Sequence, residues 1–341
     1  MANLSSGLNT MVYHWRRNRW LFDPRRFFSR YEHVPIRRPI FFVGNQGGGL
    51  TLISRMIRRH PDVVSISGDH RYWSGADEMQ RVMELRLSPN LKMARYAYRG
   101  EPRHERLTRP RSWSYATDDL LEGYRRTEAD YNERDARKLK FLIREALHKY
   151  GGGDPNKRFT DKSQVFTVKM RFIQALLGDA EPYFVLITRN PYAACYRAAL
   201  GKAIDMQRYA ATMSLDERVA YCAEHWTNAI GCALEDGPHV SHFKVMRFED
   251  FLRNPDSSLR DLCAFLDLSF DEDMLPRPHH DLPLGSRFRD RWYPLKPDVN
   301  ERYLRKISPR HVEMIAARCE PLAGQLGYEP VADPATASPY A

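Results

Sequence analysis

The chain has 341 residues, of which 43% are hydrophobic and 28% charged; this composition excludes a mainly disordered protein. Its formal net charge of +10 favours an anionic partner such as a nucleotide, a phosphorylated or sulfated substrate, an acidic glycan or a membrane surface. No apolar run reaches the roughly 18 residues of a transmembrane helix. The five cysteines include no C-x-x-C pair, which predicts free thiols in a reducing compartment, hence the cytoplasm.

Residues 1–38 form a basic and aromatic arm, in which eight arginines are accompanied by only two acidic residues, Asp23 and Glu32. This pattern indicates an arm packed over the domain with its arginines in solvent. The same mixture would also suit peripheral contact with an anionic membrane surface, so two interpretations stay open.

Residues 40–57 carry the strongest local pattern. The apolar run 40–43 predicts a strand buried on both faces, and the apolar spacing of 50–57 predicts a helix. Four of the six residues between them, 44–49, are glycine. Glycines let backbone N–H groups converge on a phosphate, and the helix N-terminus adds the positive end of its dipole. The pattern therefore predicts an anion-binding loop.

The spacing Gly44-x-x-x-x-Gly49-x-Thr51 is that of a nucleotide phosphate loop, but Leu50 stands where NTPases need lysine. An ATPase, GTPase or kinase is therefore disfavoured. The alternative without a ligand is a tight turn from strand to helix. Three consecutive glycines are costly in backbone entropy, which makes that alternative less attractive.

Residues 62–67 predict a second strand, which is followed by Asp69 and His70. Residues 71–155 are charged and weakly apolar, so they predict a helical insertion or lid. Its helices are expected at 76–87, 117–129 and 135–149. Further strands are predicted at 165–169, 183–188 and 243–247.

Strands separated by helices predict an α/β fold with a P-loop-like, mainly parallel sheet flanked by helices. We expect an arm at 1–38, an α/β domain at 39–330 that carries the insertion, and a tail at 331–341. Ligands of such sheets bind at the carboxyl ends of the strands. The glycine loop, Asp69, His70 and Arg189 each follow a predicted strand, so they should share one crevice.

Four stretches, in this order, resemble one family, the sulfotransferases that use 3′-phosphoadenosine 5′-phosphosulfate (PAPS). They are 42–63 with the glycine loop, 185–191 with Arg-Asn-Pro, 245–255 with Arg-Phe-Glu-Asp, and 326–328 with Leu-Gly-Tyr. The resemblance implies transfer of a sulfuryl group from PAPS to a hydroxyl of a carbohydrate or lipid-linked acceptor. The product would be 3′,5′-ADP, with no metal and no nucleic-acid partner; the oligomeric state stays open. The alternative is a nucleotide-binding protein of this fold without sulfotransferase activity.

The resemblance also implies site residues. The 5′-phosphate would be held by the loop residues Gln46, Gly47, Gly48, Gly49, Leu50 and Thr51. The 3′-phosphate would be held by Arg189, with Arg197 as a second candidate. Asp69 and His70 are the candidates for the base that takes the proton of the acceptor hydroxyl.

Two positions depart from the family pattern. Gly47 stands where the family usually carries lysine or arginine, so another cation must serve or catalysis is lost; Lys162 and Arg171 are the candidates. Arg197 stands where the family usually has serine. It could bind the 3′-phosphate in a bidentate manner, or it could be a solvated helix residue.

The acceptor cannot be identified from the sequence. Aromatic residues of the insertion would suit stacking on a sugar or on a flat apolar acceptor, although they could equally belong to the core: Tyr72, Trp73, Trp113 and Tyr115. A basic stretch near the C-terminus could close over the adenosine: Arg287, Arg289, Arg291 and Trp292.

Overall fold

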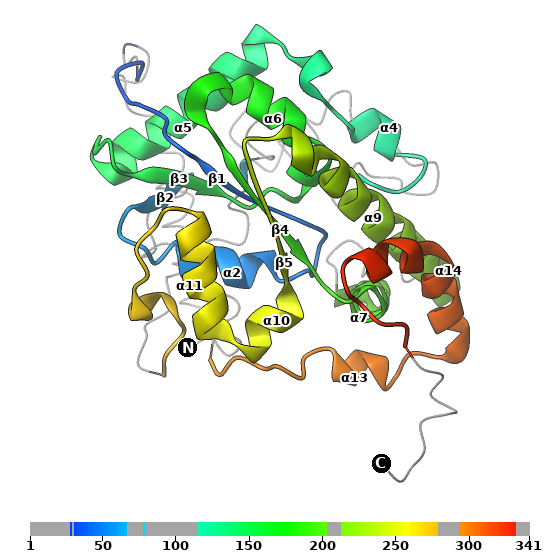
Figure 1. The fold of residues 1–341 in the computed structure, drawn as a ribbon. Coiled ribbons are helices and arrows are strands. Elements are labelled where there is room, and N and C mark those ends of the chain that lie inside the picture. Colours follow the sequence, from blue (N-terminus) through cyan, green and yellow to red (C-terminus); the bar gives the residue numbers. More distant parts are fainter. Residues whose placement is uncertain are drawn as a thin grey trace, which may run out of the picture.

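One sheet of five parallel strands forms the centre of the computed structural model, which describes residues 28, 31–66, 78–79, 115–202, 213–278 and 293–331. The strand order is β2-β3-β1-β4-β5, so β1 is central (Figure 1). The strands are β1 (Ile40–Val43), β2 (Val63–Ser65), β3 (Arg158–Asp161), β4 (Tyr183–Thr188) and β5 (His242–Arg247). The predicted α/β fold with a parallel sheet is confirmed.

Helices cover both faces of the sheet (Figure 1). One face carries α5 (Glu133–Gly151), α6 (Met170–Leu177), α7 (Pro191–Arg197), α9 (Leu215–Asp236) and α14 (Pro309–Gln325). The other carries α2 (Leu50–Ile57), α10 (Phe248–Arg253) and α11 (Pro255–Phe265). Strand side chains alternate between faces, so Phe41 packs in the first core and Phe42 in the second.

Shorter elements connect these layers. They are α4 (Leu121–Tyr124), α13 (Glu301–Leu304), the 3-10 helices η4 (Glu128–Asp130), η5 (Gln164–Val168), η6 (Gly178–Ala180), η8 (Gly237–His239) and η9 (Glu272–Met274), and the π-helical turn η7 (Ala198–Lys202). The helix predicted over 117–129 is thus only α4 and η4. It is interrupted because Arg125 has an extended ψ of 131°.

The strand predicted at 165–169 is wrong, because residues 164–168 form η5. The strand of this region is β3, which lies earlier and contains Arg158 and Asp161. Both are buried yet satisfied: Arg158 Nε donates to the carbonyl of Arg38 at 2.8 Å, and Asp161 accepts the N–H groups of Met79 and Ser163. Long-range bonds of this kind let a polar sequence form a buried strand.

The described part of the predicted insertion packs on the sheet, since Tyr115, Leu139 and Ile143 belong to the same core as Phe41. The domain boundaries themselves stay a prediction. In the part of the chain that the structure describes, no helix is both long and apolar enough to cross a membrane.

The connections that leave β1 and β4 run in opposite directions along the sheet. From β1 the chain passes through α2 to β2 at one edge, and from β4 it passes through α7 and α9 to β5 at the other. Ligands of open parallel sheets bind in the crevice outside the carboxyl ends of the strands at such a switch point. The glycine loop after β1 and Arg189 after β4 border this crevice.

Candidate active site

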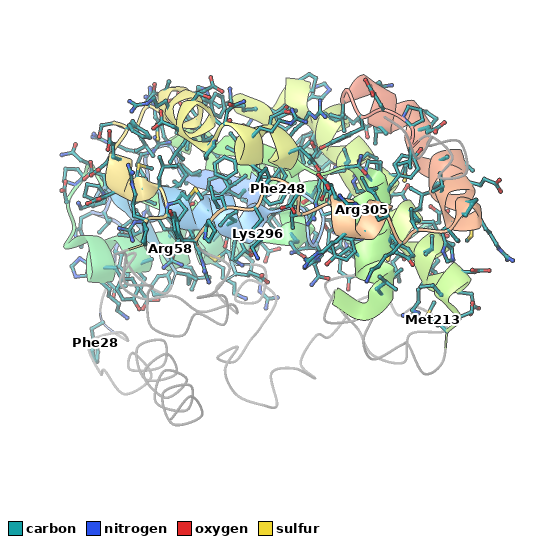
Figure 2. All side chains as sticks on the ribbon, turned by 90° about the horizontal axis from the view of Figure 1, so that it is seen from below. Phe28, Arg58, Met213, Phe248, Lys296 and Arg305 are labelled. Carbon is teal, nitrogen blue, oxygen red and sulfur yellow. The ribbon has the colours of Figure 1, made fainter. Side chains whose placement is uncertain are left out.

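The glycine loop is shaped by a tight contact at its end. Gly49, the residue before α2, has a φ of 100°, and a Cβ there would lie 2.2 Å from Cδ2 of Phe248. Only glycine accepts both the left-handed backbone and this approach. Phe248, labelled near the middle of the molecule in Figure 2, also lies 5.3 Å beneath the guanidinium of Arg189. The ring therefore packs against both the loop and the arginine.

Arg189 lies directly against the glycine loop. Its Nη1 donates to the carbonyl oxygen of Gly47 at 2.7 Å, and its Nε donates to Oδ1 of Asn300 at 2.8 Å. The residue is only 3% exposed, and its Nη2 has no partner among the described residues. The arginine is placed at this point because α7 begins right after it, with Asn190 accepting from the Ala193 N–H as the helix cap.

A network from three elements holds Arg189. Asn300, just before α13, donates to Oε1 of Glu249 at 2.5 Å. The same oxygen accepts the N–H of Asn190 at 2.9 Å, and the other carboxylate oxygen accepts from the hydroxyl of Tyr328 at 3.2 Å. Figure 1 shows α13 passing below α7 and α10, at the side where β4 and β5 end. The C-terminal part of the chain thus fixes the arginine that faces the loop.

A second guanidinium reaches the loop from α7. A Cβ built on Gly47 would lie 2.7 Å from Nη1 of Arg197. Burial first, and the positive charge of Arg197 second, lower the pKa of Arg189 to about 10. Two arginines that repel each other beside a glycine loop and the start of a helix make a site suited to an anion.

The profile of the sulfotransferase family matches residues 39–272, more than half of the chain. This chain belongs to the sulfotransferase family. The match begins before β1 and ends within η9, so it includes the loop, Arg189 and Arg197.

Two solved structures have the same fold as this chain at low sequence identity. The "Sulfotransferase Domain from the Curacin Biosynthetic Pathway" is 14% identical, with a TM-score of 0.53 over 86% of this chain and 99% of that one. Sulfotransferase STF9 from Mycobacterium avium is 13% identical, with a TM-score of 0.53 over 94% of this chain and 84% of that one. A search among curated proteins found no match.

Leu50, at the position where NTPases have lysine, is buried in the core of the α2 face. Gln46 and Thr51 are half-buried at the loop surface. Gly48 closes a turn inside the loop, since its N–H donates to the carbonyl of Asn45 at 3.1 Å. The first N–H groups of α2 have no partner within the helix and can serve an anion.

The two candidates for a replacement cation, Lys162 and Arg171, both contact carboxylates. Lys162 lies just after β3, and its Nζ is 3.1 Å from Oε1 of Glu78, with both side chains about one-tenth exposed or less. Arg171, on α6, pairs with Glu128 of η4. Within the described residues, no three His, Cys, Asp or Glu side chains form a group that could bind a metal.

Other predicted site residues lie outside the described residues. These are the candidate bases and most of the acceptor and closing residues: Asp69, His70, Tyr72, Trp73, Trp113, Arg287, Arg289, Arg291 and Trp292. Tyr115 is described and fully buried in the main core, where its ring meets His225 edge-on at 4.7 Å. Sequence reasoning did not identify Asn300, because nothing in the local sequence links it to Arg189.

A cavity of about 710 Å³ lies at the amino ends of the strands, on the side of the sheet opposite to the glycine loop. Its lining includes Arg38, Arg158, Glu181 and Asp267. These charges largely satisfy each other or the backbone, as in the 2.8 Å pair between Arg38 and Asp267. The cavity is separate from the loop because of this position. Its paired charges indicate no single class of ligand.

Proposed function

We propose that this sulfotransferase moves a sulfuryl group from PAPS to a hydroxyl of a carbohydrate or lipid-linked acceptor in the cytoplasm. The observation that supports this most is the 2.7 Å hydrogen bond from Arg189 to the Gly47 carbonyl. This bond holds a buried cation from the end of β4 next to the glycine loop after β1. A donor with two phosphates needs two such anion-binding groups close together.

The residues present fit such a donor. PAPS supplies the sulfuryl group and carries phosphates at its 5′ and 3′ ends. Nη2 of Arg189 is a buried donor without an acceptor in the described chain. A buried donor of this kind lowers stability unless a ligand accepts its hydrogen bond. With a pKa of about 10, Arg189 keeps its charge at neutral pH and can bind a phosphate.

The chain's own residues then have distinct roles. The backbone N–H groups of 46–51 other than that of Gly48, which donates to the Asn45 carbonyl, bind the 5′-phosphate together with the Thr51 hydroxyl. Arg189 binds the 3′-phosphate, and Asn300 and Glu249 keep its guanidinium oriented. Asp69 or His70 takes the proton from the acceptor hydroxyl as its oxygen bonds to sulfur. The bond from sulfur to the 5′-phosphate oxygen breaks, and that oxygen keeps the electron pair.

A second candidate function is nucleotide binding without transfer. It is favoured by one observation: residues 44–51 include no lysine or arginine. Removing one charge-stabilising contact from a closed site typically costs about 3–4 kcal/mol of barrier. The choice therefore depends on whether another residue supplies that charge.

The test is transfer of labelled sulfate from PAPS to a panel of sugar and lipid-linked acceptors, alongside calorimetric binding of 3′,5′-ADP. Turnover by the wild type, lost in Arg189→Ala and kept in the surface variant Arg253→Ala, would support the transferase. Binding of 3′,5′-ADP without turnover would favour the second candidate. Absence of both would overturn the proposed donor.

A further inference from the structure

The glycine loop must obtain positive charge from outside itself. A phosphate bound by 44–51 would meet backbone N–H groups and the partial positive charge at the start of α2, but no loop cation. Three cations of the described chain are already engaged by other groups. Lys162 and Arg171 contact carboxylates, and Arg189 donates to the Gly47 carbonyl.

Arg197 occupies the space that a side chain at position 47 would need. A Cβ on Gly47 would lie 2.7 Å from Nη1 and 3.8 Å from Cζ of Arg197. Real Cβ atoms do not approach a nitrogen so closely, so the guanidinium would have to leave this position if residue 47 had a side chain. Gly47 also has a φ of 83°, which favours glycine. The missing side chain of Gly47 is thus what admits the Arg197 guanidinium to the loop.

The two arginines approach Gly47 from different sides. Arg189 donates to its carbonyl oxygen, and the Arg197 guanidinium lies next to the position that a Cβ would occupy. Their mutual repulsion contributes to the lowered pKa of Arg189. A donor with two phosphates would relieve this repulsion by placing one negative group at each guanidinium.

We infer that Arg197 supplies, from the end of α7, the cation for the phosphate bound by the glycine loop. This inference rests on the proposed function and deepens it: Arg197 acts at the 5′-phosphate rather than at the 3′-phosphate. During transfer its charge stabilises the 5′-phosphate oxygen that keeps the electron pair when the bond to sulfur breaks. The charge at the loop then comes from α7 instead of from position 47.

Nucleotides with a single phosphate distinguish the two ends. We would measure the affinity of 5′-AMP and of 3′-AMP by competition against a fluorescent 3′,5′-ADP derivative. The variants are Arg197→Ala and the neutral polar Arg197→Gln, with Arg253→Ala as the control that removes the same charge from an exposed site on α10. Thermal unfolding would identify any variant that does not fold.

The inference predicts that both Arg197 variants lose 5′-AMP affinity by at least about tenfold while 3′-AMP affinity stays within about twofold, because charge-assisted hydrogen bonds are strong and local. Arg253→Ala should leave both affinities unchanged. A selective loss of 3′-AMP binding, an equal loss of both ligands or no loss would overturn the role of Arg197. If the wild type binds no adenine nucleotide at all, the proposed function itself is wrong. This result differs from the three above, in which the wild type binds nucleotide and only the role of Arg197 is wrong.

Discussion

Gly49→Ala tests the glycine loop at its tightest point. A Cβ at this position would lie 2.2, 2.5 and 2.8 Å from three ring carbons of Phe248, and the backbone φ is 100°. A non-glycine residue in this region of φ costs about 1–3 kcal/mol. Forcing the ring aside adds about 1–3 kcal/mol of overpacking. We expect the free energy of unfolding to fall by about 2–6 kcal/mol in total.

Urea unfolding followed by tryptophan fluorescence would measure this loss. Combining Gly49→Ala with Phe248→Ala removes the clash, so the double-mutant cycle should show a favourable coupling of at least about 1 kcal/mol. Gly324→Ala on α14 is the matched control, because a Cβ there meets nothing within 4 Å. Wild-type stability of Gly49→Ala, or a coupling of zero, would refute the contact between the loop and Phe248.

Three further predictions concern buried polar groups. Asn300→Ala removes the acceptor of the Arg189 Nε–H, so calorimetry should show 3′,5′-ADP affinity reduced about threefold to tenfold; unchanged affinity would exclude the positioning role. Burial raises the pKa of Asp161 from 3.8 to about 6, so the folded state binds this proton more tightly and stability falls as pH rises through that window. The free energy of unfolding lost in this way is about 3 kcal/mol at most. The difference in this free energy between wild type and Asp161→Asn should therefore change as pH rises from about 4 to 6, and a constant difference would contradict the prediction. Asp236 is fully buried and accepts hydrogen bonds from both Nη atoms of Arg125, so Asp236→Ala should lower the free energy of unfolding by about 3–5 kcal/mol. The double variant Arg125→Met/Asp236→Leu removes both charges together and should unfold at nearly the wild-type urea concentration.

The central strands could be predicted because their environment is uniform. The strand β1 is apolar at every position, β4 at every position except its last, Thr188, and both are buried on both faces, so the sequence of each shows its place in the sheet. The strand β3 could not be predicted, since Arg158 and Asp161 depend on partners more than 80 residues away, in addition to the nearby Ser163 N–H that Asp161 accepts. Long-range satisfaction of polar groups leaves no periodic signal in the local sequence.

The site was predictable only in outline. The rule that strand ends share one edge predicted that the glycine loop and Arg189 lie together. The rotation of α7 that directs Arg197 to Gly47 could not be predicted, because helix periodicity does not say which loop a helix end will meet. Asn300 and Glu249 lie 51 residues apart and meet only after the C-terminal segment has folded over α10.

The most direct test of the donor site is calorimetric titration of 3′,5′-ADP into the wild type, Arg189→Ala and the exposed control Arg253→Ala. The account predicts one binding site per chain in the wild type and the control, and an affinity at least about tenfold weaker in Arg189→Ala. Equal affinity in all three proteins would contradict the claim that Arg189 and the glycine loop together bind the donor.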